Sequence, residues 1–447
     1  MMVGKYHAYP EYKDTGVEWL GFFPSHWEVS KHKYIATFKK GRNSSILSDV
    51  PKDAFVKYLS MDYLRGNTAP TYAFPESGSY LAKSGQPLII WDGSNAGEFV
   101  KAKVGLVSST MAALELKCEL EETYYWYACL CLEPEMRRHS YGMGIPHVDG
   151  GKLKNSLIPL PKSSEQEIIA NFLDHETAKI DILIEKQQQL IKLLKEKRQA
   201  VISHAVTKGL NPAAPMRDSG IAWLGEVPEH WECIPLKRLA SIPIIDGPHE
   251  TPVKHDDGVP FVSAEAVSNG FINFEKKWGY ISKEDHALFS KRYSPRRGDI
   301  LVIKLGATTG VAAIVDTDDI FNIWVPLAAI RCNKKVLPHY VIHALRSSCV
   351  QDAIRLSWTY GTQQTLGLNT LGSIYIPTPP KEEQKDIVGY LGQQVPRFEI
   401  LIRKAENSIE LLNERRTALI SAAVTGKIDL RNWQAPAQNH TDKEKAA

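Results

Sequence analysis

SEQEIIANFLDHETAKIDILIEKQQQLIKLLKEKRQAVISHAV, residues 164–206, is the stretch that decides the fold, because it predicts one long helix between segments typical of strands and turns. A second stretch, EEQKDIVGYLGQQVPRFEILIRKAENSIELLNERRTALISAAV, residues 382–424, repeats it without a gap, since Val424 minus Val206 gives 218 and so does Ile376 minus Ile158. A helix of this length spans roughly 60 Å at 1.5 Å per residue. Each helix therefore needs a partner of matching length.

Both stretches carry apolar residues at seven-residue spacing, which predicts a coiled-coil seam. A homodimeric coiled coil would bury such a seam, but the matching helix downstream favours an intramolecular antiparallel pair. The seam residues of the two helices are Ile180, Ile184, Ile191, Leu194, Val201 and Ala205, and Phe398, Ile402, Ile409, Leu412, Leu419 and Ala423.

Length and composition set the broad class of the protein. A chain of 447 residues predicts two or more domains. Its hydrophobic content of 43% and charged content of 23% are ordinary for a globular protein. The sequence has neither an apolar run long enough to cross a bilayer nor the apolar core of a signal peptide, so we expect a cytoplasmic protein without a membrane partner. The six cysteines form no C-x-x-C pair, which argues against a zinc site.

A second repeat starts each half of the chain. DTGVEWLGFFPSHWEVSKHKYIA, residues 14–36, recurs as DSGIAWLGEVPEHWECIPLKRLA, residues 218–240, at an offset of 204. The segments between the repeats share only short strand-like runs that end in glycine turns, such as residues 84–97 and 297–310. The chain is therefore a duplication in which the frame is repeated and the contents of each globular unit differ.

The repeats predict two globular α/β (α+β) domains separated by two long helices that pair as an antiparallel coiled coil, with an internal pseudo-twofold repeat. Helical stretches are also expected at residues 124–136 and 338–356. The predicted segments are residues 1–157 (first domain), 158–212 (first helical region), 213–375 (second domain), 376–433 (second helical region) and 434–447 (disordered tail).

No catalytic or metal site can be assembled from the motifs of the sequence. An adenine methyltransferase needs an N-P-P-Y or D-P-P-Y loop, and a nucleotide site of the dinucleotide type needs G-x-G-x-x-G; neither pattern occurs. No nuclease motif with plausible spacing is present either. An independent DNA methyltransferase is therefore disfavoured.

Basic clusters near aromatic or glycine-rich turns favour contact with DNA, although the net charge is only +3. Lys and Arg pair with phosphates, whereas Arg, Asn and Gln can read base edges in the major groove. For any one of these residues a solvated surface position explains the sequence equally well. The candidates are Lys39, Lys40, Arg42, Asn43, Asn95, Arg137, Arg138, Lys276, Lys277, Lys291, Arg292, Arg296, Arg297, Thr308, Thr309, Gln363 and Gln364.

Three motifs occur twice and in the same order. They are D-[ST]-G-x-x-W-L-G-x-x-P-x-H-W-E at residues 14–28 and 218–232, I-P-x-P-x-x-x-E-Q at 158–166 and 376–384, and A-V-T at 205–207 and 423–425. With these motifs the chain resembles, over nearly its full length, the specificity subunit of type I restriction-modification systems.

The resemblance implies a non-catalytic, DNA-binding subunit. Each globular unit would be a target recognition domain that reads one half of a bipartite sequence in double-stranded DNA. The helices would set the spacer and dock two methyltransferase subunits. S-adenosylmethionine, ATP and Mg²⁺ would be bound by the methyltransferase and restriction subunits, and no cofactor by this chain. The alternative is a coiled-coil scaffold or adaptor without DNA specificity, which explains the helices but not the repeated Trp-rich segments.

Overall fold

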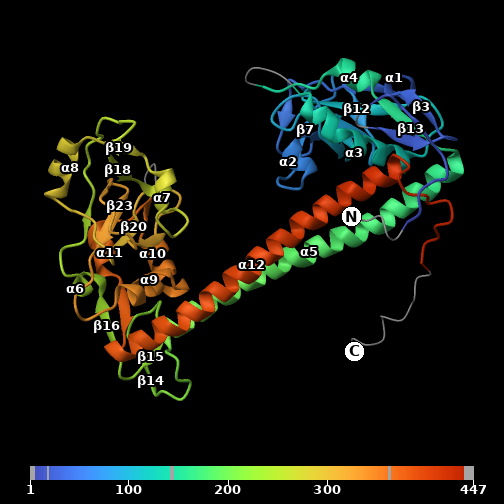
Figure 1. The fold of residues 1–447 in the computed structure, drawn as a ribbon. Coiled ribbons are helices and arrows are strands. Elements are labelled where there is room, and N and C mark those ends of the chain that lie inside the picture. Colours follow the sequence, from blue (N-terminus) through green and yellow to red (C-terminus); the bar gives the residue numbers. More distant parts are fainter. Residues whose placement is uncertain (1–5, 18–19, 141–144, 361–363, 437–447) are drawn as a thin grey trace. The chain divides into compact units, whose positions relative to one another are not determined.

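The computed structural model describes residues 6–17, 20–140, 145–360 and 364–436, and the chain forms two compact units (Figure 1). Unit 1 combines Met1–Lys186 with Ser408–Ala447, and unit 2 comprises Gln187–Asn407. Each unit thus contains one part of each long helix.

The two long helices are α5 (Ser163–Thr207) and α12 (Lys381–Val424), which extend the predicted ranges by only one residue at an end. The A-V-T motif explains where they stop, since the hydroxyls of Thr207 and Thr425 donate to the carbonyls four residues earlier, each at 2.7 Å. Gly426 follows with a φ of +70°, and a side chain there would clash with the Pro24 ring.

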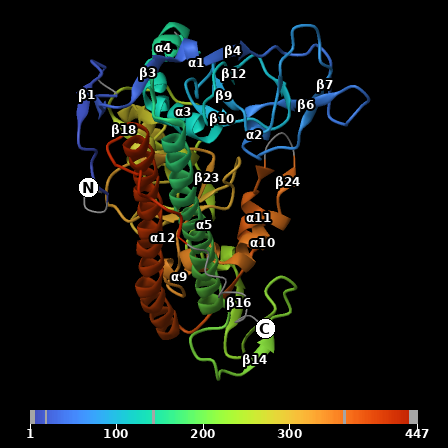
Figure 2. The same cartoon turned by 90° about the vertical axis from the view of Figure 1, so that its right-hand side faces the viewer.

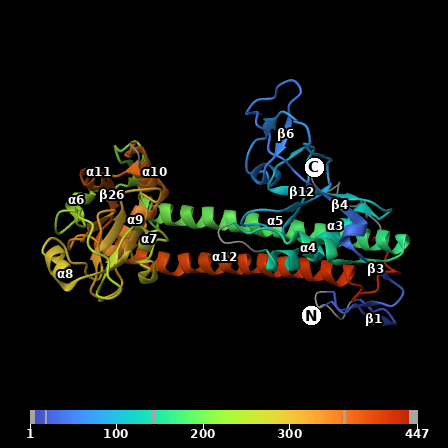
Figure 3. The same ribbon diagram turned by 90° about the horizontal axis from the view of Figure 1, so that it is seen from above.

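Unit 1 contains two main sheets and the helix α3 (Glu122–Arg138). The first has the order β10-β9-β12-β4 and is antiparallel; the second has the order β5-β7-β6-β11-β8, with β6 and β11 parallel. Figures 2 and 3 show β6 in the part of unit 1 that lies away from α5. The bounds are β4 Ala36–Lys40, β5 Leu47–Ser48, β6 Val56–Leu59, β7 Thr71–Ala73, β8 Leu81–Ala82, β9 Pro87–Ile90, β10 Phe99–Lys101, β11 Gly105–Val107 and β12 Met111–Leu116.

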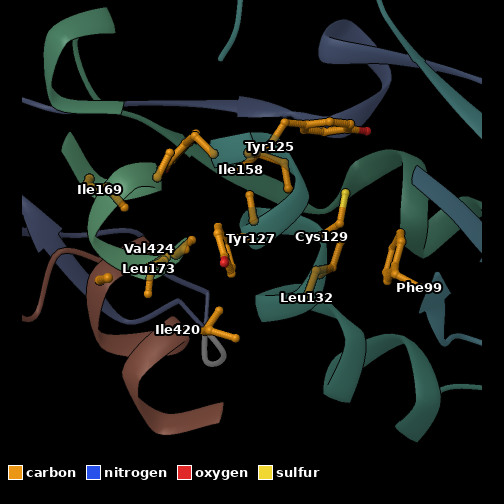
Figure 4. Packing of buried hydrophobic residues seen from close by; sticks show 14 of the residues in the cluster. Phe99, Tyr125, Tyr127, Cys129, Leu132, Ile158, Ile169, Leu173, Ile420 and Val424 are labelled. Carbon is orange, nitrogen blue, oxygen red and sulfur yellow. The ribbon is translucent and has the colours of Figure 1, made fainter. Parts of the chain in front are cut away.

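The core of unit 1 joins α3 to the ends of both long helices. Tyr127 and Leu132 of α3 lie in one core with Leu173 of α5 and Ile420 and Val424 of α12, and Tyr127 is the one on the side of the long helices (Figure 4). All five side chains are nearly or fully buried. Burying a large aliphatic side chain contributes roughly 1.5–3 kcal/mol, so the helix ends belong to this core rather than lying beside it.

Unit 2 repeats this arrangement with its own sequence. An antiparallel sheet has the order β17-β23-β20-β21, and a smaller sheet has the order β19-β18-β22 with β18 and β22 parallel. Tyr340 of α9 (Pro338–Arg346) is buried in one core with Val206 of α5 and Leu391 of α12. The bounds are β17 Ile245–Asp246, β18 Val259–Val262, β19 Gly279–Ile281, β20 Ile300–Ile303, β21 Ala312–Ile314, β22 Asn322–Ile323 and β23 Leu327–Ile330.

Shorter elements complete the two units. The helical stretch expected at residues 338–356 forms two helices, because the chain turns at Ser347. The remaining bounds are β1 Tyr12–Asp14, β2 Phe22–Pro24, β3 Glu28–Lys31, α1 His32–Ile35, α2 Met61–Leu64, α4 Gly150–Asn155, β13 Leu157–Leu160, β14 Met216–Asp218, β15 Glu226–Pro228, β16 Glu232–Pro235, α6 Leu236–Leu239, α7 Ala264–Val267, η1 Phe274–Lys276, α8 Lys283–Ser290, α10 Ser348–Leu356, β24 Thr359–Tyr360, β25 Gln364–Thr365, α11 Leu368–Ser373 and β26 Tyr375–Thr378.

The repeated I-P-x-P-x-x-x-E-Q motif fastens each long helix to its unit. The side chain of Gln166 accepts from Glu121 N at 3.0 Å and donates to Pro161 O at 2.8 Å. Gln384 accepts from Leu337 N at 2.8 Å and donates to Pro379 O at 2.9 Å. In both cases a buried glutamine satisfies the free N–H at the start of an earlier helix of the same unit, α3 for Gln166 and α9 for Gln384.

The glutamate of the same motif meets the histidine of the P-x-H-W-E motif. Glu165 accepts from Tyr9 Oη at 2.6 Å and lies 3.1 Å from His26 Nε2. Glu383 lies 2.8 Å from His230 Nε2 and accepts from Trp231 Nε1 at 3.0 Å. The two most specific repeats of the sequence are therefore joined to each other inside each unit.

Within each unit, the segments of α5 and α12 make an equivalent ion pair. Arg416 lies 3.3 Å from Asp181 in unit 1, and Arg198 lies 3.9 Å from Glu399 in unit 2. Arg198 and Arg416 lie seven residues after the seam residues Ile191 and Ile409, so the two positions where an arginine continues the seam are paired across the helices. The ten central seam residues, Ile180, Ile184, Ile191, Leu194, Val201, Phe398, Ile402, Ile409, Leu412 and Leu419, are all buried or half-buried.

Candidate nucleic-acid interface

Four segments converge at the C-terminal end of β9, in the β10-β9-β12-β4 sheet of unit 1. They are residues 40–43, 91–97, 108–110 and 145–148. We refer to them as loop cluster 1. Trp91 N donates to Thr110 O at 2.7 Å, and Gly93 N donates to Pro146 O at 2.9 Å. Gly41 lies directly against the carbonyls of Val107 and Ser108, where a side chain would clash. Backbone contacts therefore fix the cluster, which leaves its exposed side chains free to vary.

Loop cluster 2 is the counterpart in unit 2 and consists of residues 246–249, 304–310, 324–326 and 364–366. Lys304 N donates to Pro326 O at 2.8 Å, and Gly306 N donates to Gln364 O at 3.1 Å. Gly247 lies against the backbone of Ile323 and Trp324, as Gly41 lies against Val107 and Ser108. The two clusters thus share one backbone scheme.

The glycine turn at the centre of each cluster has the same geometry in both units. Gly97 N donates to Ile90 O and Gly310 N to Ile303 O, both at 2.8 Å. The φ angles of the two glycines are +93° and +94°, a region that favours glycine. The intervening residues differ, with Ser-Asn-Ala in one turn and Ala-Thr-Thr in the other.

Loop cluster 1 contains a charged group centred on Asp92. Its carboxylate lies 3.0 Å from Lys40 Nζ and 2.6 Å from His147 Nδ1. Partial burial raises the pKa of Asp92, but hydrogen bonds from His147 and Lys40 outweigh this and lower the pKa below its ordinary value. Asp92 is therefore ionised at neutral pH.

Loop cluster 2 contains a similar group centred on Asp246, which is 4% exposed. One carboxylate oxygen accepts from Arg292 Nη2 at 2.6 Å. The other lies 3.0 Å from Lys304 Nζ and 3.1 Å from His249 Nε2. Burial raises the pKa of Asp246, yet the hydrogen bonds from Lys304 and Arg292 lower it overall. Three basic side chains thus surround one acid.

The structure brings four predicted DNA-contact residues of unit 1 into loop cluster 1: Lys40, Arg42, Asn43 and Asn95. The side-chain oxygen of Asn43, Oδ1, accepts from Tyr58 Oη at 2.7 Å and from Ser109 N at 3.0 Å. Its amide group is thereby oriented while its two N–H donors stay available. Lys39, a further candidate, directly precedes Lys40 on β4 and is exposed.

In unit 2 the structure brings Thr308, Thr309 and Gln364 together in loop cluster 2. Arg292 joins this cluster because its side chain pairs with Asp246. Thr308 is exposed, whereas Thr309 is buried and its hydroxyl donates to Gly306 O at 2.7 Å. Thr309 therefore stabilises the turn, and Thr308 is the exposed residue of the two. Gln363 lies outside the described residues.

The other predicted basic residues lie on other elements. Arg137 Nη1 lies 3.7 Å from Glu98 and Arg138 Nη1 lies 3.2 Å from Glu135. Arg297 pairs with Asp318 at 2.8 Å, and Arg296 donates its backbone N–H to Asp299 at 2.9 Å. Lys276 at the end of η1 and Lys291 after α8 are exposed, whereas Lys277 is half-buried and its Nζ donates to Phe274 O at 3.2 Å.

Sequence reasoning missed Asp92, His147, Asp246, His249 and Lys304. Each is a single polar residue without a spacing that connects it to its partners. Only the fold brings residues 40 and 92, or 246 and 304, together.

Among the described residues no group of three or more His, Cys, Asp or Glu side chains could hold a metal ion. In the described part of the chain, no helix is both long and apolar enough to cross a membrane.

Comparison with known proteins identifies the fold that carries these clusters. The family profile described as type I restriction modification DNA specificity domain matches residues 24–193 and 228–411, which is most of the chain. The chain belongs to this family.

Individual relatives agree with the type I restriction modification DNA specificity family. The MjaVIII specificity subunit of a type I restriction enzyme from Methanocaldococcus jannaschii is 26% identical over 92% of this chain and 94% of its own length. The EcoBI specificity subunit from Escherichia coli is 25% identical over 86% of this chain and 82% of its own length.

A solved structure confirms the fold of this type I specificity chain. It comes from a study of complex assembly and conformational transition of the type I R-M system. The TM-score is 0.64 at 19% identity, with 90% of this chain and 98% of that chain covered.

Proposed function

We propose that the chain is the DNA-reading specificity subunit of a type I restriction-modification complex, in which each loop cluster contacts one half of a two-part target in double-stranded DNA. The observation that carries this is the pair of loop clusters, which have the same backbone scheme but different exposed side chains. A protein that reads two different half-sites needs such a constant frame with variable contacts.

The side chains of the clusters have the chemistry that DNA reading requires. Lys40, Arg42 and Arg292 are exposed cations that can pair with phosphates, which positions a protein on the duplex without reading its sequence. Asn43, Asn95, Thr308 and Gln364 have donors or acceptors that can address base edges. The clusters therefore combine positioning groups with reading groups.

In this proposal α5 and α12 pair as an antiparallel coiled coil that acts as a spacer, and a pseudo-twofold axis relates the two halves of the chain. The equivalent ion pairs of Arg416 with Asp181 and of Arg198 with Glu399 support this, because they occur at the same offset of 218. The spacer would set the number of base pairs between the half-sites.

The helices would also dock two methyltransferase subunits. Apolar side chains that are not in the seam are 43–64% exposed along both helices, namely Ile182, Leu183, Leu190, Leu193, Ile400, Leu401 and Leu411. Exposed apolar rows of this kind mark interaction surfaces.

Each unit also has a cavity at an equivalent position beside a long helix. One of about 340 Å³ is lined by Arg416 and Ile420, and one of about 610 Å³ by Arg198 and Ile202. Two equivalent cavities fit two copies of one partner.

We expect the chemistry to reside in the partners. Methyltransferase subunits would bind S-adenosylmethionine, and restriction subunits would use ATP and Mg²⁺, while this chain contributes recognition. The complex would act on chromosomal and incoming DNA in the cytoplasm.

The test is to purify the chain alone and with its cognate methyltransferase subunits, and to map methylated adenines in DNA exposed to the complex. The proposal predicts tight, sequence-dependent binding mainly in the complex and one two-part methylated target. A scaffold or adaptor would give neither, and that result would overturn the proposal.

A further inference from the structure

The charged groups of the two loop clusters contain the same residue types on exchanged segments. Because Gly41 and Gly247 occupy the same place in the frame, Lys40 corresponds to Asp246. Trp91 and Lys304 correspond as well, since each donates its backbone N–H to the facing loop. Unit 1 therefore has Lys on the first segment and Asp on the second, and unit 2 has Asp on the first and Lys on the second.

This exchange keeps one feature constant, an aspartate that holds a lysine and a histidine. Asp92 holds Lys40 and His147, and Asp246 holds Lys304 and His249. The two aspartates are not matched by the sequence repeat, so the duplication alone does not explain them. A shared requirement of the two clusters does.

Two basic partners of each aspartate are far more exposed than the aspartate itself, whereas the third partner of Asp246, Lys304, is only 10% exposed. The side chain of Asp246 is 4% exposed, whereas those of Arg292 and His249 are 49% and 69% exposed. In unit 1, Asp92 is 20% exposed, and Lys40 and His147 are 49% and 51% exposed. A single carboxylate neutralises one cation, so loop cluster 2 keeps at least one positive charge in a fixed position.

We infer that Asp92 and Asp246 are positioning residues that hold exposed basic side chains, Lys40 and His147 in one unit and Arg292 and His249 in the other, for contact with DNA phosphates. The inference rests on the proposed function. Its physical basis is that long basic side chains lose rotamer freedom when they pair with a phosphate. Side chains that are already oriented by a carboxylate lose less.

Whether DNA affinity falls or rises when the aspartate is replaced by asparagine distinguishes a positioning carboxylate from one that merely lies near the DNA. A carboxylate that merely lies near DNA repels phosphates, so its conversion to an amide would tighten binding. A positioning carboxylate that becomes an amide releases its basic partners, and binding weakens. Asp→Asn substitutions therefore give opposite results under the two interpretations.

The experiment measures DNA affinity of the complex between the full chain and its methyltransferase subunits from 50 to 300 mM salt. Duplexes with the methylated target and with a scrambled target are compared. Asp92→Asn and Asp246→Asn should each weaken binding about tenfold on both duplexes and reduce the log–log salt slope by about one. Asp352→Asn is the matched control, because Asp352 pairs with Arg355 on the exposed face of α10, outside the clusters.

A second variant keeps the test valid if Asp246→Asn folds poorly. Arg292→Gln removes an exposed partner and should lower the salt slope equally, and adding Asp246→Asn to it should change the slope little. Affinity that is unchanged or tighter in the aspartate variants, with the wild-type slope, would overturn the inference. If the wild-type complex showed no preference for its target, the proposed function itself would fail instead.

Discussion

The carboxylates of Glu165 and Glu383 each pair with the histidine of a P-x-H-W-E motif, but they differ in how deeply they are buried. The side chain of Glu165 is 6% exposed and bonds to Tyr9, whose pKa is raised by burial and by this hydrogen bond. The side chain of Glu383 is 26% exposed. A buried charged acceptor contributes more than an exposed one, because its loss leaves buried donors without a partner.

We therefore expect Glu165→Ala to lower the free energy of unfolding by about 1–3 kcal/mol, and Glu383→Ala to lower it by less. Urea denaturation of the full chain at neutral pH measures both. An equal effect, or a larger effect of Glu383→Ala, would contradict this ranking.

His32 predicts a pH dependence of stability. Burial lowers its pKa to about 4, and its Nε2 lies 2.7 Å from Tyr125 Oη. The unfolded histidine, with a pKa near 6.5, takes up a proton first as the pH falls, so this stability is present above that value and is lost as the pH falls toward 4. From pH 7 to pH 5 the loss from His32 is about 2 kcal/mol.

The measurement compares urea unfolding at pH 7 and pH 5 for the wild type and His32→Gln. The substitution should reduce the difference between the two pH values, even if it lowers stability at both. A difference that stays the same would show that His32 is not the group responsible.

Among the elements, the long helices could be predicted from the sequence and most strands could not. Residues 164–206 have a period sustained over six turns or more, so local pattern alone defines the helix. The strands have two to six residues, and the parallel pairing of β6 with β11 depends on contacts across about fifty positions. No local pattern encodes such a register.

The same reasoning explains the candidate site. Lys40, Arg42, Asn43 and Thr308 could be predicted because they lie at glycine turns, which are visible in the sequence. Asp92 and Asp246 could not, because their partners come from distant segments.

The helix seam can be tested by comparing two side chains on α12. Ile402 is 7% exposed and Leu411 is 64% exposed. Ile402→Ala should lower the free energy of unfolding by about 2–4 kcal/mol, because it leaves a cavity. Leu411→Ala should change it by less than about 0.5 kcal/mol.

Leu411→Asp tests the proposed docking surface, because an added charge on an apolar interface weakens association. We expect weaker binding of methyltransferase subunits, measured by analytical ultracentrifugation, with folding retained. Unchanged binding for this variant and for Leu193→Asp would exclude these rows as the docking surface.

Helix length gives a further prediction. One heptad inserted at equivalent places in α5 and α12 adds about 10 Å, or about three base pairs at 3.4 Å each. Mapping of methylated adenines should find the same half-sites with a gap about three base pairs longer. An unchanged gap would contradict the spacer role.

At the scale of the whole molecule, the duplicated frame implies that the two half-sites are read separately. Asn43→Ala should relax one half of the target, and Thr308→Ala should relax the other, each costing about 1–3 kcal/mol of discrimination where a base is contacted. Methylation mapping of both variants measures this. A change in both halves from either substitution would argue against independent reading.

The composition of the cores has a consequence for biosynthesis. Unit 2 is continuous in sequence, so its residues 187–407 leave the ribosome together. The core of unit 1 includes Leu419, Ile420, Ala423 and Val424, which are made after the whole of unit 2, although the first sheet of unit 1 is made before unit 2. Unit 1 is therefore the second to complete its core, and its early strands leave apolar surface uncovered until the end of α12 has been made. A chain truncated before α12 is complete would leave that surface exposed permanently.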